Sequence, residues 1–244
     1  MHKRRLDLPN EFCRYSDIRT YSDNKVEINS EHKYINASWI HLPEVKYFIA
    51  TQGPLESTIQ DFWEMCLSYN VKVILMLCNL KENNIEKCKN YWEANLIRYE
   101  IKKLKEYTLE EGIIIRELEI KNKNYNIGNI IVQIQLTTWD DHTASITNYN
   151  KIIKIIQFID NKKQNCPAVV HCSAGVGRTG TFLSLYNLYH EILEQIKDKN
   201  KKEIIFSIWN LVRKLKEMRL YLVENKSQYL FLYQFVNILL KENN

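Results

Sequence analysis

Three of the six glycines in this 244-residue chain fall within six consecutive positions, Gly175-Val176-Gly177-Arg178-Thr179-Gly180. They follow a short apolar run, Pro167-Ala168-Val169-Val170, and precede a segment of helical character that extends to about Ile196. Glycines between a strand and a helix let the backbone approach a bound group closely, and the first N–H groups of the helix then face that group. The sequence therefore predicts a strand, a tight loop and a helix that together bind an anion.

Two nucleotide-binding motifs are alternatives for this loop. The glycines match G-x-G-x-x-G, but a dinucleotide fingerprint belongs to a strand-helix-strand unit with an acidic residue about 20 residues later. Here two further helical segments follow, and the fingerprint leaves Cys172 and Arg178 without a role. The P-loop motif is excluded because the chain contains no Gly-Lys-Ser or Gly-Lys-Thr.

Cys172 and Arg178 are separated by five residues, and this spacing gives the better interpretation. A tight loop of this length can wrap one tetrahedral dianion, with backbone N–H groups on its oxygens and the guanidinium bidentate to two of them. The cysteine then lies beneath the phosphorus atom. The residues predicted to line the phosphate site between these two are Ser173, Ala174, Gly175, Val176 and Gly177.

The same loop predicts a nucleophile. A free thiol has a pKa of about 8.5 and is mostly protonated at neutral pH. The helix dipole and N–H groups that bind phosphate also stabilise a thiolate, so we expect Cys172 to ionise readily. The hydroxyl of Thr179 is placed to donate to that sulfur and to help it leave in a second step.

The rest of the chain predicts one α/β domain over residues 1–244, with a mixed, highly twisted central sheet flanked by helices. There are only six glycines and four prolines, and no linker or internal repeat interrupts the sequence. Helices are predicted at residues 61–69, 145–163, 177–196, 203–218 and 227–240. Strands are predicted at residues 71–78, 96–104, 112–120, 128–136 and 167–170, the middle three antiparallel.

Composition excludes several classes of function. The net charge of +5 is modest, and the lysines are dispersed without aromatic interleaving, which disfavours nucleic-acid binding. No apolar run is long enough to span a bilayer and no secretory signal is visible, so we expect a cytoplasmic protein. The six cysteines are far apart and form no zinc-type cluster, so neither a metal nor another cofactor is expected. Nothing in the sequence indicates an oligomer.

The segment V-H-C-S-A-G-V-G-R-T-G resembles the phosphate-binding loop of the tyrosine-specific protein tyrosine phosphatases. Other motifs of that family recur in order and at its spacings over nearly the whole chain. They are Tyr34-Ile35-Asn36-Ala37-Ser38, Thr51-Gln52-Gly53-Pro54, Asp61-Phe62-Trp63-Glu64-Met65, Lys87-Cys88, Tyr91-Trp92 and Thr137-Thr138-Trp139. The resemblance implies that fold, hydrolysis of phosphotyrosine through a cysteinyl-phosphate on Cys172, and phosphotyrosine-containing proteins as partners.

The resemblance also implies roles for residues outside the loop. In the family the proton for the departing tyrosinate comes from the aspartate of a mobile Trp-Pro-Asp loop, and the matching position is Asp141. The segment that begins at Cys13 resembles the recognition loop, although Cys13 stands where the family usually has Asn. There Tyr15 would stack on the substrate ring and make the pocket deep, and Asp17 would accept a peptide N–H group.

Departures from the family pattern affect the mobile loop and the second step. Asp140 replaces the proline and His142 a common glycine, which changes the backbone freedom of that loop. Glu224 replaces the glutamine that positions the hydrolytic water, whereas the second glutamine is retained as Gln228. A carboxylate at Glu224 would repel the phosphoryl group, so we expect slower hydrolysis of the intermediate.

These departures leave two hypotheses open. The chain is either an active phosphotyrosine phosphatase or a phosphatase-shaped module that captures phosphotyrosine proteins and turns them over poorly. A dual-specificity or lipid phosphatase is a third alternative, which the deep pocket expected at Tyr15 disfavours. The compact length and the divergent loop residues also resemble single-domain viral members of the family, including those of bracoviruses.

Overall fold

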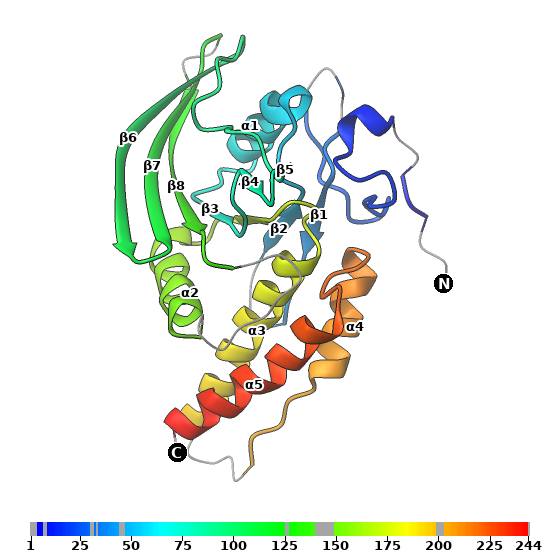
Figure 1. Cartoon of the computed structure of the whole chain (residues 1–244), viewed down its shortest axis with the longest axis vertical. Helices are drawn as coiled ribbons and strands as arrows, with labels where there is room; N and C mark the ends of the chain where they lie inside the picture. The colour runs from blue at the N-terminus through cyan, green and yellow to red at the C-terminus, as the bar shows by residue number, and fades with distance from the viewer. Residues whose placement is uncertain are drawn as a thin grey trace.

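A seven-stranded mixed sheet lies at the centre of the molecule in the order β1-β2-β9-β3-β8-β7-β6 (Figure 1). The computed structural model describes residues 4–6, 9–29, 32, 34–43, 47–124, 127–139, 149–198 and 203–243. The strands of this sheet are β1 (Ala37–Ile40), β2 (Phe48–Thr51), β3 (Val73–Met76), β6 (Tyr99–Glu110), β7 (Ile113–Asn122), β8 (Ile127–Leu136) and β9 (Ala168–His171). A separate two-stranded sheet pairs β4 (Lys81–Glu82) with β5 (Ile85–Glu86).

The central strands β3 and β9 are buried at every position, which explains the apolar sequence of β3 and the Ala-Val-Val run that precedes His171 in β9. Strand β9 pairs in parallel with β2 and β3, and β3 pairs in parallel with β8. The expected antiparallel set β6, β7 and β8 is confirmed. The first of these strands is predicted at residues 96–104 but runs from Tyr99 to Glu110, because its second half pairs with residues 113–117 of β7.

Strands β1 and β2 are missing from the sequence-based prediction. Each has only four residues, and β1 pairs antiparallel with β2 at the edge of the sheet. Such short runs carry too few positions for a periodic signal. Their burial depends on neighbours that are far away in sequence, such as β9 beside β2.

The helices are α1 (Ile59–Ser68), α2 (Tyr149–Lys163), α3 (Gly177–Lys197), α4 (Ile208–Met218) and α5 (Lys226–Glu242). The predicted helix at residues 203–218 begins only at Ile208, because the Ser207 hydroxyl accepts a hydrogen bond from the Asn210 N–H and caps the helix there. The part of the second predicted helix at residues 145–148 lies outside the described residues. The other helices agree with prediction to within about two residues.

Helices cover the sheet on both sides (Figure 1). In that view α1 lies above the short strands, whereas α2, α3, α4 and α5 lie below them. Helix α3 packs against both α4 and α5, and most of its first half is buried, including the polar residues Arg178 and Thr179. The start of α3 is therefore held in the interior directly after the central strand β9.

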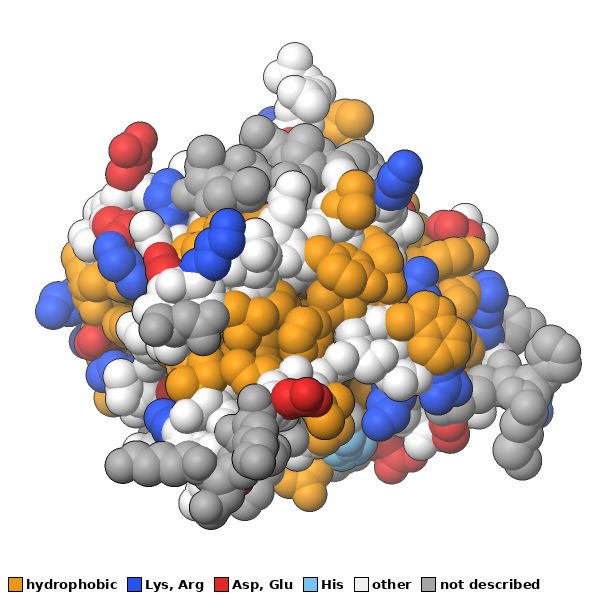
Figure 2. Space-filling view, turned by 90° about the horizontal axis from the view of Figure 1, so that it is seen from below, with side chains coloured by type: hydrophobic (Ala, Val, Ile, Leu, Met, Phe, Trp, Pro, Cys, Tyr) orange, Lys and Arg blue, Asp and Glu red, His pale blue; other side chains and the backbone are white. Residues whose placement is uncertain are grey.

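The helical end of the molecule carries an apolar patch ringed by charge. Figure 2 views this end from below and shows hydrophobic side chains gathered near the middle of the face, with Lys and Arg side chains around them. Exposed apolar side chains on α4 and α5 include Trp209, Leu230 and Tyr233. Within the described part of the chain, no helix combines the length and apolar character needed to cross a membrane.

Candidate active site

The loop between β9 and α3 has its carbonyl groups tied outward. The Cys172 carbonyl lies 3.1 Å from His171 Nδ1, and the Ser173 carbonyl accepts from the Gly53 N–H at 2.8 Å. The carbonyls of Ala174 and Gly175 accept from the Arg219 guanidinium at 3.2 and 2.9 Å. Because C=O and N–H point in opposite directions across a trans peptide, the N–H groups that follow these four carbonyls face the inside of the loop. The loop is thus a nest for an anion.

Arg219 braces this loop from behind. It is completely buried, and its guanidinium also contacts the hydroxyl of Ser38 on β1 at 3.3 Å. Burial lowers the pKa of Arg219 to about 10, so the side chain remains charged at neutral pH. This cation strengthens the electrostatic preference of the loop for a negative charge.

Gly175 is the residue on which the sharp turn depends. Its φ is +71°, and a Cβ atom there would lie 2.1 Å from the Thr51 carbonyl oxygen. Any side chain would therefore be strained in conformation and would also collide with the backbone at the end of β2. The glycine cluster of the sequence thus reflects close packing as well as anion binding.

Cys172 lies at the bottom of the loop and is 4% exposed. The Thr179 hydroxyl donates a hydrogen bond to its sulfur at 3.3 Å, as the sequence predicts. A hydroxyl donor at this distance stabilises negative charge on sulfur. Thiol and hydroxyl are brought together by the first turn of α3.

Arg178 enters the same space from the start of α3. Its two Nη atoms contact the Glu82 carboxylate at 2.8 and 3.0 Å, and Nη1 also donates to the Trp139 carbonyl at 2.9 Å. Burial opposes the charged form, but the hydrogen bonds to Glu82 and the proximity of Cys172 raise the pKa of Arg178 above its usual value. The guanidinium is therefore a permanent cation held in one orientation.

Tyr15 forms one wall of the site. Its hydroxyl lies 3.0 Å from the Ser173 hydroxyl, which joins the recognition segment to the loop. Gln52 anchors that segment, since its side chain accepts from the Arg14 N–H and donates to the Phe12 carbonyl. Arg14 in turn donates to the Gly53 carbonyl at 2.9 Å. This anchoring fixes the position of the tyrosine ring relative to the thiol.

These groups surround a cavity of about 330 Å³. Its lining residues are Tyr15, Asp17, Ile18, Ile85, Lys87, Cys172, Ser173, Ala174, Gly177, Arg178 and Glu224. Most of the residues predicted from the sequence to form the site are in this set. Gly175 and Val176 complete the loop behind it, while Asp141, together with Asp140 and His142, lies outside the described residues.

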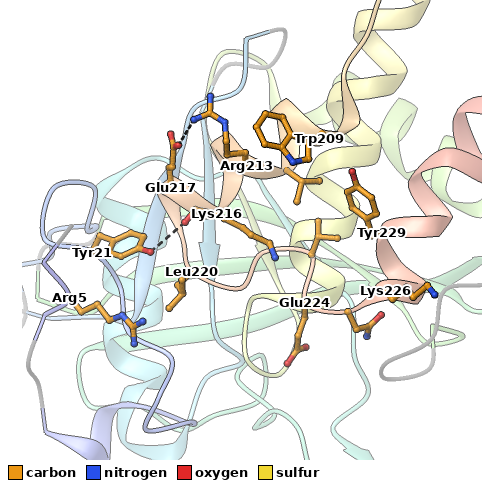
Figure 3. Close-up of a pocket in the computed structure, with 13 residues that line it drawn as sticks. Arg5, Tyr21, Trp209, Arg213, Lys216, Glu217, Leu220, Glu224, Lys226 and Tyr229 are labelled. Atoms are coloured by element: carbon orange, nitrogen blue, oxygen red, sulfur yellow. Dashed lines mark hydrogen bonds and ion pairs between the residues drawn. The ribbon is translucent and has the colours of Figure 1, made fainter. Parts of the chain in front are cut away.

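Glu224 and Gln228 flank the start of α3. A Cβ atom on Gly177 would lie 2.8 Å from a Glu224 carboxylate oxygen and 2.9 Å from the Gln228 amide nitrogen. The Gln228 side-chain oxygen accepts from the Glu224 N–H at 2.9 Å and from the Asn225 N–H at 3.4 Å, at the start of α5. Glu224 also borders a larger pocket of about 1260 Å³ formed by α4, the start of α5 and the amino-terminal segment (Figure 3).

Sequence reasoning missed Glu82 and Arg219 as parts of the site. Glu82 lies in the short strand β4, 96 positions before Arg178. The residues around it in the sequence are polar and form no motif that would single it out. Arg219 lies five positions before Glu224, in the segment Arg219-Leu220-Tyr221-Leu222-Val223-Glu224 that is in register with the family pattern, and this register is the available signal. Its role became visible only through its contacts with the loop carbonyls.

The family model for protein-tyrosine phosphatase matches residues 9–237. Human tyrosine-protein phosphatase non-receptor type 20 is 36% identical over 231 residues, covering 91% of this chain and 53% of the relative. The Drosophila melanogaster tyrosine-protein phosphatase 69D is 35% identical over 248 residues, covering 93% of this chain and 16% of the relative. The chain thus spans about half the length of the type 20 phosphatase and a smaller part of the other.

Solved structures give the same result. The catalytic domain of human protein tyrosine phosphatase non-receptor type 18 superposes with a TM-score of 0.84 at 28% identity, covering 94% of this chain and 84% of that one. A structure of PTPN18 in complex with HER2 phosphopeptides matches with a TM-score of 0.85 at the same identity and covers 94% of this chain and 88% of that one. The match over residues 9–237, together with the thiol, hydroxyl and guanidinium around one cavity, shows that the chain belongs to the protein-tyrosine phosphatase family.

Proposed function

We propose that the protein hydrolyses phosphotyrosine in proteins through a cysteinyl-phosphate intermediate on Cys172. The observation that carries the proposal is the loop whose outward-tied carbonyls direct N–H groups at one cavity, with the Cys172 sulfur at its base and the Arg178 guanidinium at its side. Tyr15, whose hydroxyl lies 3.0 Å from the Ser173 hydroxyl, is expected to make the cavity deep enough to favour a phosphorylated tyrosine over the shorter phosphoserine. No cofactor is needed for this chemistry.

In the first step the Cys172 thiolate attacks phosphorus and the bond from phosphorus to the tyrosine oxygen breaks. Asp141 donates its proton to the departing tyrosinate, whose conjugate acid has a pKa of about 10. Arg178 and the loop N–H groups bind the equatorial oxygens and stabilise the spread charge of the transition state. The products are the free tyrosine side chain and the phosphorylated cysteine.

In the second step water attacks the phosphorus and the sulfur–phosphorus bond breaks. The Asp141 carboxylate takes a proton from the water, and the Thr179 hydroxyl stabilises the sulfur as it leaves. Glu224 and Gln228 lie beside Gly177, close to the face from which water would approach. Inorganic phosphate and the regenerated thiolate complete the balance.

The direct test is the hydrolysis of phosphotyrosine and phosphoserine peptides of matched sequence, with p-nitrophenyl phosphate as a substrate that needs no peptide contacts. We expect turnover of p-nitrophenyl phosphate and strong preference for the phosphotyrosine peptide. A wild type no faster than Cys172→Ser would support the phosphotyrosine-capturing alternative instead. Equal rates on the two peptides would favour a dual-specificity phosphatase.

Asp141 is expected to act as the general acid, although it lies outside the described residues. Trp139, two positions earlier in the sequence, accepts a hydrogen bond from Arg178 through its carbonyl, which places Trp139 at the site. We expect Asp141→Asn to lower kcat by roughly 10²- to 10⁴-fold and to remove one limb of the pH–rate profile. Asp140→Asn is the matched control and should retain most activity. A larger loss of kcat in Asp140→Asn than in Asp141→Asn would assign the general acid to Asp140.

Glu224 is expected to slow the second step. Replacing it by glutamine restores the neutral group of the family pattern, so Glu224→Gln should raise kcat by about fivefold or less. The effect is small because the interaction free energy between an exposed carboxylate and a nearby charge is at most about 1 kcal/mol. Rapid-quench measurement should show less phosphoenzyme at steady state. Glu217→Gln is the control, since Glu217 also lines the larger pocket and pairs with Arg213 (Figure 3). A fall in kcat for Glu224→Gln would mean that the carboxylate activates water.

The finer assignments are also proposals. We propose phosphotyrosine-containing proteins as partners, supported by the phosphopeptide complexes of PTPN18. Asp17 lines the cavity, and we propose that it accepts a peptide N–H group of the substrate. A cytoplasmic location, a signalling role and a viral origin stay predictions from the sequence.

A further inference from the structure

A chain of hydrogen bonds crosses the interior from the catalytic loop to the middle of β7. It joins His171 to Tyr91 at 2.9 Å, Tyr91 to Gln133 at 2.6 Å, and Gln133 to Arg116 at 2.9 Å. All four side chains are buried, with exposed fractions of 0 to 7%. Water therefore does not compete for these groups, and each link depends on its protein partners.

Arg116 sets the direction of this chain because its guanidinium only donates. Its Nη1 atom lies 2.9 Å from the side-chain oxygen of Gln133 and 2.8 Å from that of Gln135. Its Nε atom donates to Glu106, and the guanidinium stacks 4.4 Å from the Trp92 ring centre. With the oxygen of Gln133 turned to Arg116, the amide nitrogen must face the other way.

The Gln133 amide nitrogen therefore donates to the Tyr91 hydroxyl oxygen. An amide NH₂ group has no acceptor to offer, so the Tyr91 proton must point elsewhere. The strong acceptor within reach is His171 Nε2 at 2.9 Å, since the Met76 sulfur is a weak acceptor at 3.9 Å. Burial raises the pKa of Tyr91, which keeps the phenol protonated at neutral pH.

His171 must then accept at Nε2, so the neutral imidazole carries its proton on Nδ1. That N–H faces the Cys172 carbonyl oxygen at 3.1 Å and donates to it. This is one of the outward bonds that turn the loop N–H groups toward the phosphate. In the opposite tautomer the lone pair on His171 Nδ1 would face the lone pairs of the Cys172 carbonyl oxygen in a buried site, which costs about 1–3 kcal/mol.

We propose that Gln133 and Arg116 are positioning residues that fix the Nδ1–H tautomer of His171 and thereby hold the catalytic loop in its phosphate-binding shape. Arg116 orients the Gln133 amide, the amide orients the Tyr91 hydroxyl, and the hydroxyl selects the tautomer. Neither residue touches the substrate. The kcat/KM measurements rest on the proposed function, whereas the tautomer of His171 is measured independently of catalysis.

The test uses Gln133→Glu, which keeps the size of the side chain but replaces the donor by an acceptor. A carboxylate still binds Arg116 and now accepts the Tyr91 proton, so His171 Nε2 must be protonated to reach the tyrosine oxygen. ¹⁵N NMR of the histidine rings reports this directly. We expect Nδ1 protonated and Nε2 unprotonated in the wild type, Nε2 protonated in Gln133→Glu, and kcat/KM lowered by at least about tenfold.

Gln135→Glu is the matched control. Gln135 lies on the same strand, contacts the same Arg116 atom and is also buried, but its amide nitrogen donates to the Cys78 carbonyl and not to Tyr91. It introduces the same charge beside the same Arg116 atom but makes no contact with Tyr91. We expect His171 Nε2 to stay unprotonated in Gln135→Glu, with a smaller loss of kcat/KM than in Gln133→Glu.

A third variant removes the intermediate link. In Tyr91→Phe the hydroxyl is absent, so adding Gln133→Glu should change neither the tautomer nor kcat/KM much further. Three results would overturn the inference: a wild-type His171 protonated on Nε2, an unchanged Nε2 in folded Gln133→Glu, or equal effects of Gln133→Glu and Gln135→Glu. If Gln133→Glu fails to fold, Tyr91→Phe decides the question. A tautomer and a kcat/KM that are both as in the wild type would reject the relay.

Discussion

Cys172→Ser is expected to lower kcat for p-nitrophenyl phosphate by on the order of 10⁵-fold, as found when a covalent nucleophile is removed. A serine hydroxyl is not ionised at neutral pH, so it lacks the nucleophile that the loop stabilises. The N–H groups and Arg178 remain, so the variant should still bind phosphotyrosine peptides. Isothermal titration with a phosphotyrosine peptide and rapid-quench mass spectrometry would measure binding and the phosphoenzyme separately.

The control for this substitution is Cys166→Ser. Cys166 is partly exposed and lies before β9, at the end of that strand opposite the catalytic loop. It should retain wild-type kcat and still form the phosphoenzyme. Phosphoenzyme on a residue other than Cys172, or residual turnover of Cys172→Ser near that of the wild type, would remove the covalent mechanism.

Arg178→Lys is expected to lower kcat/KM by roughly 10³-fold, within the range found when a transition-state arginine is lost. A lysine keeps the charge but cannot bind two phosphate oxygens and the Glu82 carboxylate in one plane. The affinity for vanadate, which imitates the five-coordinate transition state, should fall together with kcat/KM. Steady-state kinetics and vanadate inhibition would measure both effects.

Arg213→Lys is the matched control, since Arg213 is exposed on α4, forms an ion pair with Glu217 one turn away and lies over the Trp209 ring, far from the catalytic loop in the sequence. We expect no more than a small change in kcat/KM there. Thermal unfolding of both variants separates stability from catalysis, because the substitution changes a buried ion pair at Arg178 and an exposed one at Arg213. If Arg178→Lys kept full vanadate affinity, the guanidinium would not be the phosphate ligand.

Much of the site was accessible from local sequence because its parts lie close together in the chain. Cys172, Arg178 and Thr179 are within eight positions, and their spacing alone defines a loop that encloses one anion. The apolar run before them and the helix after them supply the strand and the dipole. Local geometry of this kind depends on a few consecutive dihedral angles, which residue type constrains directly.

Other parts of the site are contacts between distant segments. Glu82 reaches Arg178 across 96 positions, and Arg219 reaches the loop carbonyls across 44 and 45. No local sequence pattern predicts either contact, because a polar residue in a short strand or at the end of a helix is common in any sequence. The pairing of β9 with β3 puts the chain that follows β3, which includes Glu82, beside the catalytic loop. The packing of α4 against β1 and α3 brings Arg219 to the same loop.

The sequence by itself determined that a tight anion-binding loop lies between a buried strand and a helix, and that a thiol and a guanidinium share it. The tertiary structure decided which groups hold that loop in shape: Gly53, Arg219 and, through Tyr91 and Gln133, His171. The physical reason is directionality. A residue pattern specifies burial and local backbone geometry, whereas the direction of a buried hydrogen bond is set by a partner that only folding places opposite it.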